Sequence, residues 1–158
     1  MSKIEGSTEK SMITMWSLMS ERFERPEKVL ICRSHITTAF AEQHLVIGAM
    51  IDGSLALWDL NEVSNSYKEI TIDNQMFVLR TPSYNSALTA REHDCPVITI
   101  KQLTLSESNE ESIHFVTVDE NGILIIWAIN EVKEEINDLD YGHWMSAKRL
   151  VKLLLRNR

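Results

Sequence analysis

The feature that most restricts how this chain can fold is a short apolar hairpin that ends in tryptophan. The run Leu45–Met50 is followed by Asp52 and Gly53, and Trp58 lies five residues beyond that glycine. Asp-Gly is a preferred centre of two-residue β-hairpin turns, because both central residues take positive φ. We therefore expect two apolar strands here, joined by a tight turn and closed by the tryptophan.

The same pattern occurs twice more. Asn121 and Gly122 follow a second apolar run, and Trp127 again lies five residues after the glycine. A weaker copy near the start of the sequence ends in Trp16 and has Ser11 in the position of the glycine. A hairpin repeated with its tryptophan in the same position indicates an internal repeat.

The spacing of the tryptophans indicates the size of the repeat. Trp16 and Trp58 are 42 residues apart, which is the length of one four-stranded blade of a WD-type propeller. Trp58 and Trp127 are 69 residues apart, so the second unit carries an insertion, at about residues 64–94. Inside the insertion, Phe77–Thr81 reads as a strand that ends at Pro82.

The strands before the tryptophans are apolar at nearly every position, as in Ile123–Trp127. Such runs are typical of strands covered on both faces. A covered parallel sheet would need a crossover helix after each strand, whereas two-residue turns join these strands. We therefore predict an all-β chain, a partial WD-type β-propeller of about two to three four-stranded antiparallel blades.

We expect residues 1–141 to form the propeller segment, with blade ends near residues 11–18, 36–60 and 97–129. The run Val29–Cys32 reads as the outer strand of the first blade. Residues 142–158 form a basic tail that fits either a strand or a helix. Fewer than four blades of about 40 residues fit into this chain, and propellers close with roughly four to eight. We therefore expect a slice of a longer propeller, whose missing blades belong to a longer chain.

Charge and cysteine content argue against several classes of protein. The net charge of −7 disfavours a protein that binds nucleic acid through phosphate contacts. Two cysteines provide no disulfide framework, so we expect a reducing location, the cytoplasm. The sequence has no apolar run of 18 residues and no apolar segment like that of a signal peptide near its start, so we expect no membrane span.

The repeats also predict a polar network. His35 stands where many WD repeats begin with Gly-His, and in such repeats this histidine commonly bonds to the turn aspartate, here Asp52. Met50 replaces the usual Ser or Thr two positions earlier, so we expect the network to be incomplete. The positions that we assign to the structural repeat are Trp16, His35, Asp52, Gly53, Trp58, Asp59, His93, Asn121, Gly122 and Trp127.

A zinc site is one alternative use of these residues. Cys32 with His35, and His93 with Cys95, could together supply four ligands. The chain has only two cysteines and no Cys-x-x-Cys motif, so a small buried strand cysteine and loop histidines are the better reading. We therefore expect no metal and no cofactor.

Catalysis is a second alternative. The residue types of a nucleophilic triad occur in His35, His44, Asp52 and Ser54. No Gly-x-Ser-x-Gly motif accompanies them, and the turn already explains Asp52. We therefore expect no catalytic residue.

Several segments resemble the WD-repeat region of dynein intermediate chains. These are Val78–Ser83 with its Arg80-Thr81-Pro82 motif, then His93, Pro96-Val97, Val118–Gly122 and Trp127. Within that family, Ser11–Ser20 and Asp52–Leu60 most resemble the branch of cytoplasmic dynein 2, the dynein of intraflagellar transport. The resemblance extends from about residue 11 to residue 129. The sequence departs from the family pattern at Ser11, Ser17, Asn121 and Ala128.

The resemblance implies a non-catalytic subunit whose propeller docks on a dynein heavy chain, with other dynein subunits as partners. It also implies a role in the retrograde motor of cilia and a location in the cytoplasm, cytoskeleton and cilium. The motifs that bind light chains in this family are absent here, so light-chain binding is assigned to no residue. The alternatives are a generic WD scaffold, an axonemal dynein intermediate chain and, from another class, a small zinc-dependent or hydrolytic enzyme.

Overall fold

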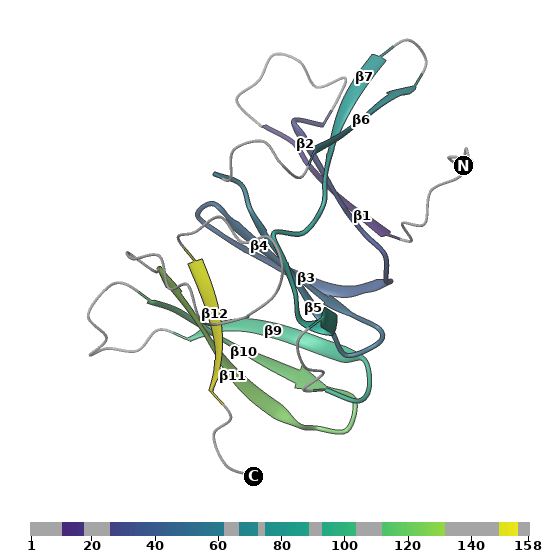
Figure 1. Cartoon of the computed structure of the whole chain (residues 1–158). Helices are drawn as coiled ribbons and strands as arrows, with labels where there is room; N and C mark the ends of the chain where they lie inside the picture. The colour runs from purple at the N-terminus through teal and green to yellow at the C-terminus, as the bar shows by residue number, and fades with distance from the viewer. Residues whose placement is uncertain are drawn as a thin grey trace.

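The computed structural model describes residues 11–17, 26–61, 67–72, 75–88, 93–103, 112–131 and 149–154. Most of these residues lie in strands (Figure 1). In chain order the elements are β1 (Ser11–Met15), β2 (Lys28–Cys32), β3 (Ile36–Glu42), β4 (Leu45–Met50), β5 (Leu55–Asp59), β6 (Tyr67–Ile72), β7 (Gln75–Arg80), β8 (Tyr84–Asn85), the 3-10 helix η1 (Ser86–Leu88), β9 (Val97–Leu103), β10 (Ser112–Asp119), β11 (Leu124–Glu131) and β12 (Arg149–Leu154). Within these ranges no helix has the length and apolar character that a membrane crossing needs.

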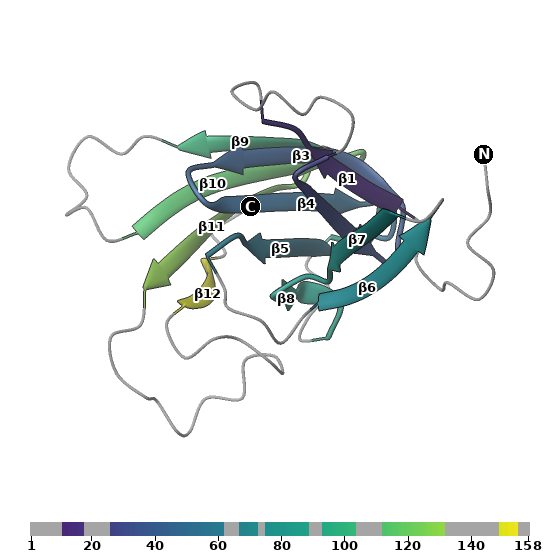
Figure 2. The same ribbon diagram turned by 90° about the horizontal axis from the view of Figure 1, so that it is seen from above.

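The strands form three four-stranded sheets that pack in sequence, face against face (Figure 1). The first sheet has the order β1-β2-β7-β6, the second β3-β4-β5-β8 and the third β9-β10-β11-β12. Seen from above, β3 and β9 lie along one side of the stack, whereas β8 and β12 lie along the other (Figure 2). The prediction of an all-β, partial WD-type propeller is confirmed.

Every strand pair in the second and third sheets is antiparallel, and short turns join β3 to β4, β4 to β5 and β10 to β11. Turns form at both predicted places, but the expectation that both central residues take positive φ is wrong: Gly53 (φ +81°) and Gly122 (φ +78°) have positive φ, whereas Asp52 and Asn121 do not. The N–H of Gly53 donates to the carbonyl of Met50 at 3.1 Å and that of Gly122 to the carbonyl of Asp119 at 3.0 Å, so each turn has three residues with its glycine in the left-handed region. Trp58 lies opposite Val46 on β4, and Trp127 lies opposite Phe115 on β10. The tryptophan-ended hairpin is thus the central pair of strands in each sheet.

The first sheet differs from the expected blade. β1 and β2 pair antiparallel, but β2 is not the outer strand, because β7 from the insertion pairs with its other edge. This pairing is parallel and joins Val29 to Leu79 and Leu30 to Arg80. β6 then pairs antiparallel with β7 and forms the new edge. The insertion therefore adds its two strands to the first sheet, which precedes it in the sequence, and covers the free edge of β2.

The outer strand of the second sheet, β8, contains only two residues. Two serine hydroxyls accept hydrogen bonds that the backbone of a longer strand would accept. The N–H of Leu55 donates to Oγ of Ser86 at 2.8 Å, and the N–H of Asp59 donates to Oγ of Ser83 at 3.0 Å. These bonds satisfy buried donors of β5 that a longer strand would otherwise pair.

The core consists mainly of two apolar layers, one in each gap between sheets. The gap between the second and third sheets is filled by Leu45, Ile47, Ala49, Leu55, Leu57, Tyr84, Val97, Ile100, Phe115, Ile125, Trp127 and Ile129. The gap between the first and second sheets is filled by Leu30, Cys32, Val46, Met50, Ala56 and Trp58. Because both faces of the second sheet are covered, its central strands β4 and β5 are buried throughout, which explains their continuous apolar runs.

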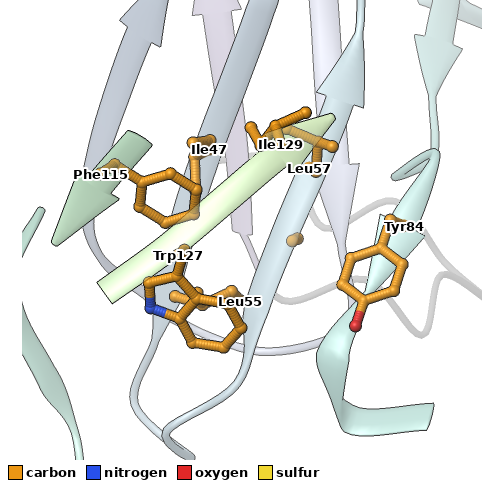
Figure 3. Close-up of a pocket in the computed structure, with 8 residues that line it drawn as sticks. Ile47, Leu55, Leu57, Tyr84, Phe115, Trp127 and Ile129 are labelled. Atoms are coloured by element: carbon orange, nitrogen blue, oxygen red, sulfur yellow. The ribbon is translucent and has the colours of Figure 1, made fainter. Parts of the chain in front are cut away.

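A small cavity of about 10 Å³ remains in the layer between the second and third sheets. Figure 3 shows Phe115 and Trp127 of the third sheet beside Ile47 and Leu55 of the second. The two aromatic rings are stacked, with centroids 5.9 Å apart. A space that holds at most one water, with an apolar lining, is a packing gap and not a ligand site.

In the basic tail, for which the sequence fits a strand or a helix, the structure has a strand. β12 pairs antiparallel with β11 from Ile126↔Leu154 to Glu131↔Arg149. The fourth tryptophan of the sequence, Trp144, lies outside the described residues, as do residues 1–10 and 18–25.

Candidate functional site

The third sheet contains a buried polar network beneath its tryptophan. His93 lies in the loop before β9, Thr117 and Asp119 lie on β10, and Trp127 lies on β11. Nδ1 of His93 is 2.8 Å from Oδ2 of Asp119, and Nε2 of His93 is 2.7 Å from Oγ1 of Thr117. The indole N–H of Trp127 donates to the same Thr117 oxygen at 2.7 Å. All four side chains are at most 1% exposed.

With His93 as a neutral imidazole, these bonds fit one direction of donation through the network. Thr117 accepts from the indole of Trp127 and can therefore donate its own hydroxyl hydrogen to Nε2 of His93. His93 then carries its proton on Nδ1 and donates it to Asp119. Every polar atom has a partner, so the network links two strands and a loop without an unpaired buried group.

Asp119 also holds the turn that follows β10. Its Oδ1 accepts from the N–H of Ile123 at 2.8 Å, and its backbone carbonyl accepts from Gly122 at 3.0 Å. Burial by itself raises the pKa of the Asp119 carboxyl, but hydrogen bonds from His93, Ile123 and Cys95 outweigh it and lower that pKa below its usual value. The carboxylate is therefore held in its charged form.

The second sheet has an apolar counterpart of this network. Met50 and Asp119 both lie eight residues before the tryptophan of their sheet. Met50 pairs with the first residue of β3, and Asp119 pairs with the first residue of β9. Cys32 precedes β3 by four residues, as His93 precedes β9. The Cys32 thiol is 3.9 Å from the Met50 sulfur, and both are buried. Burial raises the pKa of Cys32, which keeps this thiol protonated.

Gly48 stands in the second sheet where Thr117 stands in the third, ten residues before the tryptophan. A Cβ at Gly48 would lie 3.1 Å from the Trp58 ring, so the indole packs directly over this glycine. The indole N–H of Trp58 finds another acceptor, the backbone carbonyl of Arg80, at 3.2 Å. The two sheets thus hold equivalent tryptophans by different chemistry.

The expected pairing of His35 with Asp52 is not part of either arrangement. His35 is exposed, and its backbone carbonyl accepts from Ile51 at 2.9 Å. The Asp52 carboxylate accepts from the hydroxyl of Ser54 at 2.6 Å and from its N–H at 3.1 Å. Asp52 therefore stabilises its own turn.

The sequence reading did not single out Asp119 or Thr117. It placed the network aspartate next to the turn glycine, where the third repeat has the exposed Asn121. Counting back eight and ten residues from Trp127 would have found both, since the same count reaches Met50 and Gly48 from Trp58.

Gly53 forms the contact between the second sheet and the polar loop of the third. A Cβ at this position would lie 2.1 Å from the carbonyl oxygen of His93 and 3.0 Å from that of Cys95. Gly122, at the equivalent turn of the third sheet, would meet nothing within 4 Å. Only Gly53 is therefore required both for its positive φ and for a close approach of backbones.

Arg80 connects the insertion to the second sheet. Its buried guanidinium donates from Nη1 to the carbonyl of Leu60 at 3.0 Å, while its carbonyl accepts from Trp58. Thr81 is exposed and Pro82 is half-buried, and both lie between β7 and β8. The Arg-Thr-Pro motif thus connects β7, an inner strand of the first sheet, to β8 at the edge of the second sheet.

Two further repeat residues lie at or just beyond the ends of β5 and β1, and Asp59 is buried whereas Trp16 is exposed. Asp59 accepts from the N–H of Asn61 at 2.9 Å and lies 3.9 Å from Nε2 of His44. Trp16 is 50% exposed, and its indole N–H donates to Oγ1 of Thr14 at 3.3 Å.

The structure does not support the alternative zinc ligands as a site. Among the described residues, no three His, Cys, Asp or Glu side chains are grouped so that they could hold a metal ion. Cys32 is buried in the layer between the first and second sheets, His35 is exposed, and His93 is engaged by Thr117 and Asp119.

Comparison with known proteins finds two relatives, and no family model matches the chain. Cytoplasmic dynein 2 intermediate chain 1 of Mus musculus is 27% identical over 128 residues, which cover 68% of this chain and 13% of the relative. The Homo sapiens protein of the same name is 24% identical over 144 residues, which cover 78% of this chain and again 13% of the relative. The resemblance to the intermediate chain of cytoplasmic dynein 2 is confirmed, over a small part of that protein's length.

Proposed function

We propose that this chain is part of a non-catalytic scaffold subunit of a dynein motor and docks on the dynein heavy chain during retrograde intraflagellar transport in cilia. The observation that carries the proposal is the similarity to cytoplasmic dynein 2 intermediate chain 1 across 68–78% of the chain. The tryptophan-ended sheets support it, because they are the part of the chain on which the resemblance rests. Its location would be the cytoplasm, cytoskeleton and cilium.

A scaffold without chemistry of its own also agrees with the geometry of the polar network. His93, Asp119 and Thr117 combine the residue types of a hydrolytic triad, but a nucleophile must reach its substrate. His93 and Thr117 are 0% exposed, and the Thr117 hydroxyl is already bonded to two side chains. The network therefore positions strands and does not act on a substrate.

The proposed mechanism is the rigid presentation of turns to the heavy chain. The Asp52-Gly53 turn contacts the loop at His93, and the N–H of Glu120 donates to the carbonyl of Pro96 at 3.0 Å. Two turns and one loop are therefore held together at the same end of the second and third sheets, on the right in Figure 1. Apolar side chains remain exposed on the two turns, namely Ile51 and Ile123, and beside the loop on β9, namely Ile98.

The test is affinity capture of the tagged chain from ciliated cells, followed by identification of the dynein subunits that it retains. We expect the heavy chain of cytoplasmic dynein 2 to be recovered and the tagged chain to localise to cilia. A Trp127→Ala chain, which loses a buried indole at a cost of about 3–5 kcal/mol, controls for capture by unfolded protein. Recovery of an axonemal heavy chain would favour the axonemal alternative, and recovery of no dynein subunit would favour a generic scaffold.

A further inference from the structure

The insertion covers the edge of β2 through a short contact. β7 pairs with β2 at two positions, Val29↔Leu79 and Leu30↔Arg80, and this pairing is parallel. By comparison, β7 pairs with β6 at six positions. Most of the β6–β7 hairpin therefore lies beyond the residues that join it to the first sheet (Figure 1). Because a two-stranded hairpin by itself is only marginally stable in water, this hairpin depends on the short contact.

The side chains of β7 contribute to this contact at alternate positions. Leu79 is buried in one cluster with Val29 and Ile31 of β2, and Phe77 packs against that cluster. Val78, which lies between them on β7, is 39% exposed. β7 thus shows what the edge of β2 accepts, namely an extended strand that runs parallel to β2 and has apolar side chains at every second position.

The hairpin is anchored at its last residue, Arg80, by the second sheet. The indole N–H of Trp58 donates to the backbone carbonyl of Arg80 at 3.2 Å, and the guanidinium donates to the carbonyl of Leu60 at 3.0 Å. The indole of Trp58 is available for this bond because Gly48 occupies the position from which Thr117 accepts the indole N–H in the third sheet. The missing threonine of the second sheet is therefore linked to the attachment of the insertion.

We propose that the β6–β7 hairpin is a displaceable cover, and that the opened edge of β2 binds an extended peptide segment of a partner protein in place of β7. The strand under the cover is apolar and buried from Val29 to Cys32. Without β7 its edge would present unpaired backbone groups beside apolar side chains, and such edges take up strands from other chains. The partner segment would resemble β7, with apolar residues at the positions of Phe77 and Leu79. The inference does not rest on the proposed dynein function.

Hydrogen exchange of the purified chain tests whether the cover opens by itself. We expect the amides of β6 and β7 to exchange together and faster than those of β5, because the hairpin opens without unfolding the second sheet. Trp58→Phe keeps a ring but removes the N–H that holds Arg80, so exchange of β7 should rise on the order of 5-fold. Trp127→Phe is the matched control, because it loses a buried N–H in the third sheet and should leave exchange of β7 unchanged. Equal acceleration of β7 in both variants would show that the hairpin opens only with the whole molecule, and would overturn the proposal.

Binding of a peptide tests what the opened edge accepts. The probe is a fluorescein-labelled peptide of residues 75–82, which contains β7. We expect Trp58→Phe to bind it on the order of 5-fold more tightly than the wild type, because a larger fraction of the molecules is open. A peptide with serine at the positions of Phe77 and Leu79 should not bind. Arg80→Met, which removes the guanidinium anchor, replaces Trp58→Phe if circular dichroism shows that variant to be unfolded. Equal affinity for both peptides, or no binding by any variant, would overturn the proposal, and so would a dimer of Trp58→Phe in sedimentation velocity, which would assign the edge to a second copy.

Discussion

At the scale of single residues, the three tryptophans occupy equivalent positions and yet their indole nitrogens have three different partners. Trp127 donates to a buried threonine, Trp58 to the carbonyl of Arg80, and Trp16 to Thr14 near the surface. A buried indole N–H without a partner is costly, so each buried tryptophan needs an acceptor. The repeat preserves the ring and varies its hydrogen bond.

The buried bond should contribute far more to stability than the exposed one. Thr117→Val leaves the indole N–H of Trp127 and Nε2 of His93 unpaired, each at a cost of about 1–3 kcal/mol. We expect the free energy of unfolding, measured by denaturant titration, to fall by roughly 2 kcal/mol or more. Thr14→Val makes the same chemical change beside the exposed Trp16 and should alter the free energy of unfolding by no more than about 0.5 kcal/mol. Equal effects would contradict the role given to Thr117.

The lowered pKa of Asp119 predicts a loss of stability in acid. In the folded protein the Asp119 carboxyl stays deprotonated to a lower pH than in the unfolded chain, where its pKa is near 3.8. Its contribution is therefore complete above that value and is lost as pH falls through the lower, folded pKa. The measurement is the free energy of unfolding against pH for the wild type and Asp119→Asn. We expect a shallower acid slope in the variant, and parallel curves would refute the assignment.

At the scale of elements, the shortness of β8 is compensated by side chains. Ser83 and Ser86 flank this two-residue strand and accept N–H groups of β5 through their hydroxyls. Polar side chains can thus complete a sheet edge where the backbone turns away. The backbone must turn away before β8 because the preceding strand, β7, pairs with β2 of the first sheet. Arg80-Thr81-Pro82 connects the two sheets at this point.

Removing one of these hydroxyls tests the compensation. Ser86→Ala leaves the N–H of Leu55 without its acceptor in a buried strand, and we expect thermal unfolding to show a loss of about 1–3 kcal/mol. Asn85 provides a control in the same segment, because its side chain accepts the N–H of Ala87 in an exposed setting. Asn85→Ala should cost about 0.5 kcal/mol or less. A larger loss for Asn85→Ala than for Ser86→Ala would contradict this account.

At the scale of the whole molecule, stability depends on contacts between sheets as well as within them. The turn at Gly53 belongs to the second sheet, but it touches the loop at His93, which supports Trp127 of the third. The hydroxyl of Thr37 on β3 also donates its single hydrogen toward the carbonyls of Ala49 and Val97, which belong to the second and third sheets. The second and third sheets are therefore joined by backbone contacts in addition to the apolar layer.

Two glycine substitutions separate turn strain from this contact. Gly122→Ala meets no neighbour, so its cost is the positive φ alone, about 1–2 kcal/mol. Gly53→Ala has a similar φ and also places a Cβ against the His93 carbonyl, so the sheets must shift. We expect a loss of unfolding free energy at least about 2 kcal/mol greater for Gly53→Ala than for Gly122→Ala. Equal losses would show that the contact adds nothing.

The local features of the fold could be read from the sequence. The Asp-Gly and Asn-Gly turns and the apolar runs around them depend on interactions between near neighbours, so they are visible without the fold. The tryptophan spacing added the size of the blade and the existence of the insertion. These features were sufficient for the fold class and for the resemblance to dynein intermediate chains.

The tertiary structure decided which distant segments meet. The sequence does not show that β7 pairs with β2, because any open strand edge offers the same backbone groups. It also does not show that Cys32 and Met50 meet where His93 and Asp119 meet in the next sheet, since each pair comes from segments separated by intervening strands. Near neighbours thus determined the repeat, whereas packing between sheets determined how each copy of it is held together.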